Sequence, residues 1–201
     1  MSKDYHYDLV VVGGGPAGSS AAFAAAKNGI KVALIEKENS IAETVRTSGV
    51  TWIESIKEFG IPENCYNPIK NFSFASPNNE VTISDSISTA AVLDVRKTYR
   101  WLSNEAKKKG VDIFVKTNIN EVIKNEKNDI VGVSGTGIHG KIAFHSKVVI
   151  DATGFTSTIA KAMGFVTQWE RFGAGAEYEA EVEKVDSETW WLMVGQEYTP
   201  A

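Results

Sequence analysis

The fold is decided by residues 7–36, which read YDLVVVGGGPAGSSAAFAAAKNGIKVALIE. Residues 9–12 form a continuous apolar run, as expected of a parallel strand that is buried on both faces. An alanine-rich helix is predicted over residues 17–28, because Gly29 supplies a stop signal at its end. A second strand is predicted over residues 31–35. The stretch therefore predicts a strand, a glycine turn, a helix and a second strand.

The turn of this unit carries the pattern G-x-G-x-x-G at Gly13, Gly15 and Gly18. The first glycine permits a tight turn, the second lets the backbone approach a pyrophosphate, and the third allows the helix to pack closely on the strand. Glu36 ends the second strand, where its carboxylate can accept hydrogen bonds from a ribose diol and disfavours a 2'-phosphate. The unit is predicted to bind FAD or NAD, and the alternative is an ordinary structural turn.

The composition indicates a globular protein without a nucleic-acid or metal site. The chain has 201 residues, of which 43% are apolar and 23% are charged, enough for one large domain or one and a half. Its formal net charge of -4 gives no basic footprint for nucleic acid. The single cysteine, Cys65, excludes an internal disulfide and suits a reducing compartment. No set of His, Cys or carboxylate residues has the spacing of metal ligands.

The pattern after residue 36 predicts further layers of an α/β fold. In order, the predicted elements are a loop over residues 37–50, a helix over 51–59, a hairpin over 71–84, a strand over 88–93, a helix over 95–109, a strand over 112–115, a meander of strands over 119–124, 130–134 and 141–145, a strand over 147–150 and a short helix over 156–163. The strand at 112–115 follows a helix, so a crossover connection would place it in the parallel sheet. The strand at 147–150 runs into Asp-Ala-Thr-Gly at 151–154, a second glycine turn.

The pattern changes after about residue 165. Residues 170–185 and 188–194 alternate in the manner of long antiparallel strands, so a second domain is predicted from residue 166. The adjacent Trp190 and Trp191 would point to opposite faces of such a strand. With few strands and no helix to cover them, this part is expected to be incomplete, or to need a partner.

With both glycine turns placed, the chain resembles the geranylgeranyl reductase family, within the flavoprotein superfamily of p-hydroxybenzoate hydroxylase. The resemblance rests on the fingerprint at residues 8–18, on Glu36-Lys37, on the helix at 96–110 with the following Val-Asp-Ile-Phe, and on Val-Val-Ile-Asp-Ala-Thr-Gly at 148–154. The terminal runs WERFGAGAEY from residue 169 and QEYTPA from residue 196 are similar to the archaeal branch, the prenyl-lipid reductases.

This resemblance implies an α/β fold class in two domains. Residues 1–165 would form a Rossmann-like FAD-binding domain with a parallel sheet and an antiparallel meander, and 166–201 would begin an antiparallel-sheet substrate domain. Residues 66–92 would cross into the substrate domain. The cofactor-binding residues that the resemblance implies are Gly13, Gly15, Pro16, Ala17, Gly18, Glu36, Lys37, Arg46, Arg96, Ile119, Ala152, Thr153 and Gly154.

The implied activity is an FAD-dependent reduction of isolated carbon-carbon double bonds in a geranylgeranyl or other prenyl chain. The substrate would be a prenyl lipid or another small molecule, and the electron donor would be NAD(P)H or ferredoxin. No apolar run is long enough to span a bilayer, so a cytoplasmic protein is expected, with peripheral membrane contact at most. No catalytic residue follows from the resemblance. Two alternatives remain open: a flavoprotein with other chemistry, such as aromatic hydroxylation or electron transfer to a quinone, and a nucleotide-binding fragment without turnover.

The chain departs from the family pattern in three places. Residues 46–49 read Arg-Thr-Ser-Gly where family members carry a Cys-Gly pair, so no role of that thiol carries over. The family's arginine before the second helix aligns on Val95, which leaves Arg96 one residue, or about 100° of helix rotation, out of register. The family's later glycine-aspartate motif, which contacts the flavin, would fall after residue 201.

Overall fold

The computed structural model describes residues 3–165, 175, 180–181 and 183–198. The chain divides into two compact units, one made of Met1–Val45 and Tyr99–Ala174 and the other of Arg46–Thr98 and Gly175–Ala201. The segment predicted to cross between domains, 66–92, falls within the second unit, which extends further on both sides. The assignment of cofactor and substrate to the two predicted domains remains a prediction. No helix in the described ranges is both long and apolar enough to cross a bilayer.

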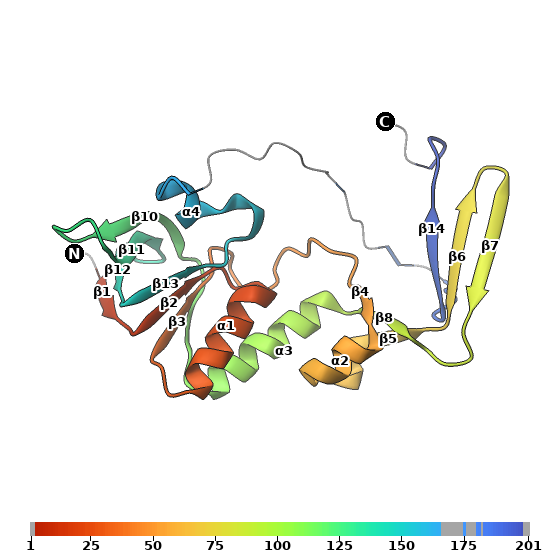
Figure 1. Cartoon of the computed structure of the whole chain (residues 1–201), viewed down its shortest axis with the longest axis horizontal. Helices are drawn as coiled ribbons and strands as arrows, with labels where there is room; N and C mark the ends of the chain where they lie inside the picture. Colours follow the sequence, from red (N-terminus) through yellow and green to blue (C-terminus); the bar gives the residue numbers. More distant parts are fainter. Residues whose placement is uncertain (1–2, 166–174, 176–179, 182, 199–201) are drawn as a thin grey trace. The chain divides into compact units, whose positions relative to one another are not determined.

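A four-stranded parallel sheet forms the centre of the first unit. Its order is β13-β2-β3-β9, with bounds Val148–Asp151, Leu9–Val12, Val32–Ile35 and Asp112–Phe114 (Figure 1). Val12 pairs with Ile35 on one side and with Asp151 on the other, so both predicted glycine turns leave the same edge of the sheet. The predicted strands, including the crossover strand β9, are therefore confirmed.

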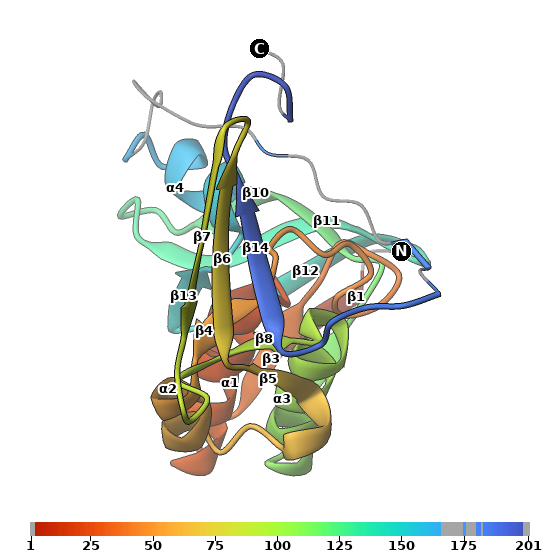
Figure 2. The same cartoon turned by 90° about the vertical axis from the view of Figure 1, so that its right-hand side faces the viewer.

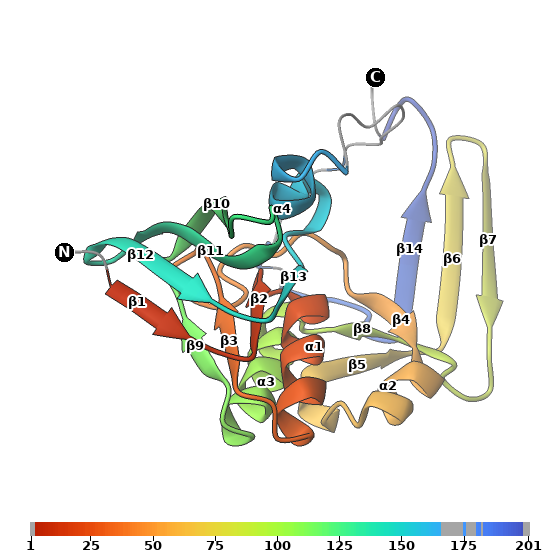
Figure 3. The same cartoon turned by 60° about the vertical axis from the view of Figure 1, so that its left-hand side comes forward.

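Alternate residues of the central strands face two different layers. Leu9 and Val11 pack with Ala22 of helix α1 (Pro16–Lys27) and with Ala106 of helix α3 (Val95–Lys108). Val10 and Val12 pack instead with the antiparallel meander, so the parallel strands are covered on both faces. Figure 3 shows α1 and the meander on opposite sides of these strands. Both helices end where the sequence predicts, next to Gly29 and Gly110, whose φ angles are 79° and 93°.

The meander consists of β10 (Asn118–Lys124), β11 (Ile130–Gly137) and β12 (Gly140–His145), which pair antiparallel as predicted. The sequence does not predict a fourth strand, β1 (Lys3–His6), which pairs parallel to β12. After β13 the chain forms a 3-10 turn, η2 (Gly154–Thr156), and a short helix, α4 (Thr158–Ala162).

In the described residues of the second unit, the strands form two three-stranded sheets. The first has the order β4-β8-β5, with bounds Val50–Trp52, Ala90–Leu93 and Tyr66–Ile69, and all its pairs are antiparallel. Helix α2 (Ile53–Phe59) follows β4 and ends at the left-handed Gly60, and a 3-10 turn, η1 (Glu63–Cys65), leads into β5. The short helix predicted over 51–59 is thus present, although its first two residues belong to a strand.

The other sheet contains the predicted hairpin of β6 (Asn71–Ser76) and β7 (Asn79–Ser84). Strand β14 (Thr189–Met193) adds to β6, and Figure 2 shows the three strands side by side. The prediction of an antiparallel strand over 188–194 is wrong in direction, because β14 runs parallel to β6. Alternation shows which side chains share a face but not which way a strand runs. The strand predicted over 170–185 lies largely outside the described residues.

Candidate functional site

The first glycine turn is built so tightly that two of its glycines have no room for a side chain. Gly13 has a φ of 109°, and a Cβ placed there would lie 2.2 Å from the carbonyl oxygen of Ala152. A Cβ at Gly18 would lie 1.9 Å from the carbonyl oxygen of Gly13. Backbone oxygens cannot give way as a flexible side chain can. Gly13 and Gly18 therefore let strand β2, helix α1 and the second glycine turn pack against one another.

Gly15 differs from these two glycines because it borders open space. It is the N-cap of α1, with φ -68° and ψ -173°, and a Cβ there would meet no atom within 4 Å. Pro16 and the exposed Ala17 begin the helix, whose first turn has no side-chain cap and no acidic residue. The first amides of a helix lack intrahelical acceptors and lie at its positive dipole end. This end of α1 therefore offers N–H donors to a phosphate that approaches Gly15.

The second glycine turn lies directly against the first. The amide of Ala152 donates to the carbonyl oxygen of Val12 at 2.8 Å, which continues the pairing of β13 with β2. Asp151 then organises the turn that contains Thr153 and Gly154. Its Oδ1 accepts from the Thr153 amide at 3.0 Å and from the Thr153 hydroxyl at 2.6 Å.

Asp151 also joins the turn to helix α4. Its Oδ2 accepts from the amides of Ile159 and Ala160, at 2.9 and 2.8 Å. Partial burial alone would raise the pKa of this carboxyl, but the hydrogen bonds from Thr153, Ala160 and Ile159 outweigh burial, and the pKa is lowered. Asp151 is a positioning residue that the sequence prediction missed. The signal was an acid at the end of an apolar run, two residues before a threonine and shortly before a helix.

Glu36 is held by the backbone on both sides of its carboxylate. Its Oε2 accepts from the Gly14 amide at 2.8 Å, and its Oε1 accepts from the Glu38 amide at 2.9 Å. Each carboxylate oxygen can accept a further hydrogen bond, so a diol remains able to bind. The loop that follows is also tied to the turn, because Ile41 is 8% exposed and a Cβ at Gly14 would lie 2.3 Å from its Cδ1. Glu36 is thus oriented beside the first glycine turn.

The other predicted residues are placed less directly. Lys37 is exposed beside Glu36. The Ile119 side chain is 4% exposed and packs in the core below the meander, so only its backbone could reach a ligand. Arg46 and Arg96 belong to the second unit, and their part in cofactor binding stays a prediction. Within the described residues, no group of three or more His, Cys, Asp or Glu residues could hold a metal ion.

Comparison with known proteins identifies the family of this site. Residues 8–190, which include both glycine turns, match the family described as FAD dependent oxidoreductase. The chain belongs to the FAD dependent oxidoreductase family. Members of this family depend on FAD, one of the two dinucleotides that the glycine pattern left open.

Several relatives of the chain are digeranylgeranylglycerophospholipid reductases. The chain is 35% identical over 201 residues to the digeranylgeranylglycerophospholipid reductase of Methanocaldococcus jannaschii, an alignment that covers 96% of this chain and 50% of the relative. It is 30% identical to a protein of Methanosarcina barkeri, over 82% of this chain and 91% of that protein. The resemblance to geranylgeranyl reductases is confirmed, and the chain spans about half the length of the digeranylgeranylglycerophospholipid reductase.

A solved structure supports the fold. A geranylgeranyl bacteriochlorophyll reductase-like protein from Thermoplasma acidophilum superposes with a TM-score of 0.72 and 30% identity, over 80% of this chain and 42% of that one. The predicted α/β class, with its parallel and antiparallel sheets, is therefore confirmed.

Proposed function

We propose that this protein binds FAD and reduces carbon-carbon double bonds of geranylgeranyl or other prenyl chains. The observation that carries the proposal is the 35% identity to a digeranylgeranylglycerophospholipid reductase over 96% of this chain. The matching stretch contains the two glycine turns and Glu36, whose geometry suits a dinucleotide. Because the chain spans half of that reductase, the activity of the whole protein is part of the proposal.

The first unit would hold the nucleotide part of the cofactor. The open space beside Gly15 and the first amides of α1 suit the pyrophosphate, because no side chain caps them. The carboxylate of Glu36, fixed by the amides of Gly14 and Glu38, suits the adenosine ribose. Asp151 would keep Thr153 and Gly154 in place at the neighbouring turn through its four hydrogen bonds.

The second unit would suit an apolar substrate. An isolated alkene has no carbonyl group to take up charge, so its reduction depends on holding it in a dry apolar site. FAD, when bound, would supply the hydride. Phe72 and Phe74 of β6 share a face with Trp190 of β14, at ring-centroid distances of 6.1 and 6.2 Å. The register adds Leu192, Val81 and Ile83 to this face, which makes it apolar over all three strands.

The test is an anaerobic assay of this chain and of a chimaera. In the chimaera, the chain replaces the matching half of the Methanocaldococcus jannaschii reductase. Each protein is loaded with FAD, reduced with dithionite and given a digeranylgeranyl lipid. The expected product gains two hydrogens for every saturated double bond, as measured by mass spectrometry. An FAD-loaded chimaera that leaves the lipid unchanged, while the parent reductase saturates it, would contradict the proposal.

The same proteins separate the alternatives. Aromatic hydroxylation would show as oxygen consumption that requires NAD(P)H and a phenol, and quinone-linked electron transfer as reduction of a quinone by the loaded protein. Multiple turnover by the 201-residue chain alone would exclude a purely nucleotide-binding fragment.

A further inference from the structure

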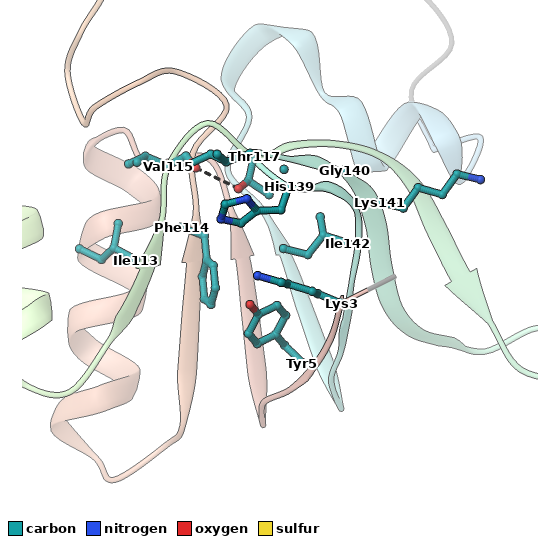
Figure 4. A pocket seen from close by; sticks show the side chains of 12 residues that line it. Lys3, Tyr5, Ile113, Phe114, Val115, Thr117, His139, Gly140, Lys141 and Ile142 are labelled. Carbon is teal, nitrogen blue, oxygen red and sulfur yellow. Dashed lines mark hydrogen bonds between the residues drawn. The ribbon is translucent and has the colours of Figure 1, made fainter. Parts of the chain in front are cut away.

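The first unit contains a pocket that shares no residue with either glycine turn. Its volume is about 220 Å³, and it lies where β1 and the β11–β12 turn meet the segment after β9 (Figure 4). The polar and aromatic residues that line it are Lys3, Tyr5, Phe114, Thr117, His139 and Lys141. The remaining lining residues are aliphatic or glycine, and none is acidic. The pocket is therefore basic and largely apolar.

Two nitrogen-bearing side chains and one hydroxyl converge in this pocket. In Figure 4 the Lys3 ammonium group, the Tyr5 hydroxyl and the His139 ring are directed toward the same part of the pocket, whereas the Lys141 amine is directed away. No hydrogen bond or ion pair joins the Lys3 ammonium group or the His139 ring to any other group in the described part of the chain. Their donors remain available to an acceptor from outside.

The floor of the pocket is rigid. The Tyr5 ring stacks on Phe144 at 5.3 Å between centroids and meets the edge of Phe114 at 5.0 Å. Phe144 is fully buried, so the Tyr5 hydroxyl is held at a fixed height above the core. The backbone of Lys3 is placed by its register with Ile142, which sets β1 beside the turn that carries His139. The preformed aromatic floor of Tyr5 and Phe114 lowers the ordering cost of binding.

We propose that this pocket binds a small organic anion, with a carboxylate or phosphate group on an apolar or aromatic body. The anionic oxygens would accept from Lys3 and His139, and the body would lie on Tyr5 and Phe114. Charge-assisted hydrogen bonds of this kind are stronger than neutral ones. Drug-sized ligands occupy sites of about 300–1,000 Å³. This pocket is smaller, which favours a molecule with a single ring over a dinucleotide.

The pocket is separate from the predicted cofactor site, although the two share a wall. Glu36 donates its amide to the carbonyl oxygen of Phe114 at 2.8 Å and accepts from the Thr117 amide at 3.0 Å, both through its backbone. The Glu36 carboxylate is turned to Gly14 and Glu38 instead. A ligand in the pocket should therefore bind together with FAD and not compete with it.

The test is a ligand titration of the full 201-residue chain at constant ionic strength. Binding is measured by the NMR chemical shifts of the backbone amides. The probes are benzoate, the neutral benzamide and inorganic phosphate. We expect benzoate to give saturable shifts at residues 139–142, and benzamide to bind at least about tenfold more weakly because it lacks the charge. Saturable binding of phosphate at the same residues would assign the site to phosphate-bearing molecules, and its absence would assign it to carboxylates.

Variants make the test specific. Lys3→Gln and His139→Gln should each weaken benzoate binding by about tenfold or more, while Lys127→Gln, on the exposed β10–β11 turn, should leave it unchanged. Both substitutions replace exposed side chains, so the fold should persist, and the amide spectrum shows this directly. The proposal is overturned if no probe gives saturable shifts, if benzamide binds as well as benzoate, if both variants bind normally, or if FAD displaces the probe.

Discussion

At the scale of single residues, the three glycines of the fingerprint have two different physical roles. Gly13 and Gly18 are required by packing, since an added Cβ would lie 2.2 and 1.9 Å from backbone oxygens. Gly15 is required by neither packing nor conformation, because its φ of -68° suits any residue and its Cβ position is open. The sequence pattern does not distinguish the three glycines. The structure shows which of them packing requires and which one borders open space.

This difference predicts opposite outcomes for two alanine substitutions. Gly18→Ala should lower the free energy of unfolding by about 2–4 kcal/mol, because the methyl group must displace backbone. Gly15→Ala should leave stability within about 1 kcal/mol and weaken FAD binding, because the methyl group fills the space beside the α1 amides. Urea denaturation and FAD titration of both variants check this. Normal FAD affinity in Gly15→Ala would remove Gly15 from the site.

Glu36 permits a second prediction at this scale. Glu36→Gln keeps one acceptor oxygen but loses the charge and the second acceptor, so FAD affinity should fall by about tenfold or more. Glu126→Gln, an exposed change on the β10–β11 turn, is the matched control. Fluorescence quenching of added FAD measures both. Equal affinity in the two variants would show that the Glu36 carboxylate has no part in cofactor binding.

Asp151 predicts a pH dependence of stability. Its hydrogen bonds lower the pKa of the folded carboxyl below the unfolded value, so it stabilises the fold fully above the ordinary carboxyl pKa of about 4. This contribution is lost as the pH falls through the lowered pKa. Asp151→Asn should therefore cost about 1–2 kcal/mol at pH 7, a figure that allows for solvent screening, and less as the pH drops below about 4. Urea midpoints at several pH values test this, and a cost that does not change with pH would contradict it.

At the scale of elements, the predictions that succeeded rest on strong local signals. Strands β2 and β3 are uninterrupted apolar runs, and α1 and α3 both stop at glycines with positive φ. Strand β1 was missed because Lys-Asp-Tyr-His carries no apolar alternation, and its partner β12 is distant in the sequence. The predicted direction of β14 was wrong for a related reason, because tertiary structure decides which strands pair and in which direction.

The layer between the parallel sheet and the meander should dominate the stability of the first unit. Phe144 is fully buried, and its ring meets the ring of Phe114 at 4.9 Å between centroids. Phe144→Ala should cost about 3–5 kcal/mol of unfolding free energy. Phe59→Ala, at a ring that is 66% exposed, should cost less than about 1 kcal/mol. Urea denaturation compares the two, and similar costs would contradict this assignment of the core.

At the scale of the whole molecule, the chain passes between two compact units more than once. Each unit is made of two separate stretches of the sequence. The chain changes from one unit to the other after Val45, Thr98 and Ala174. No local pattern marks the first two of these points, and the second lies inside α3. The crossing of residues 66–92 into a substrate domain, which the family resemblance implies, stays a prediction, and the unit that contains them begins earlier, at Arg46. The glycine turns and Glu36 all belong to the first unit, so the predicted nucleotide site rests on one continuous motif and its partner strand.

We propose that the first unit holds FAD through its glycine turns. The most direct measurement is the visible absorption spectrum of the purified 201-residue chain after incubation with FAD and gel filtration, with mass analysis of the cofactor that it releases. We predict flavin absorption with close to one FAD per chain, and a clear loss of flavin in the stable Gly15→Ala variant. A folded chain that emerges colourless, or that retains as much flavin in Gly15→Ala as in the unaltered protein, would contradict the account.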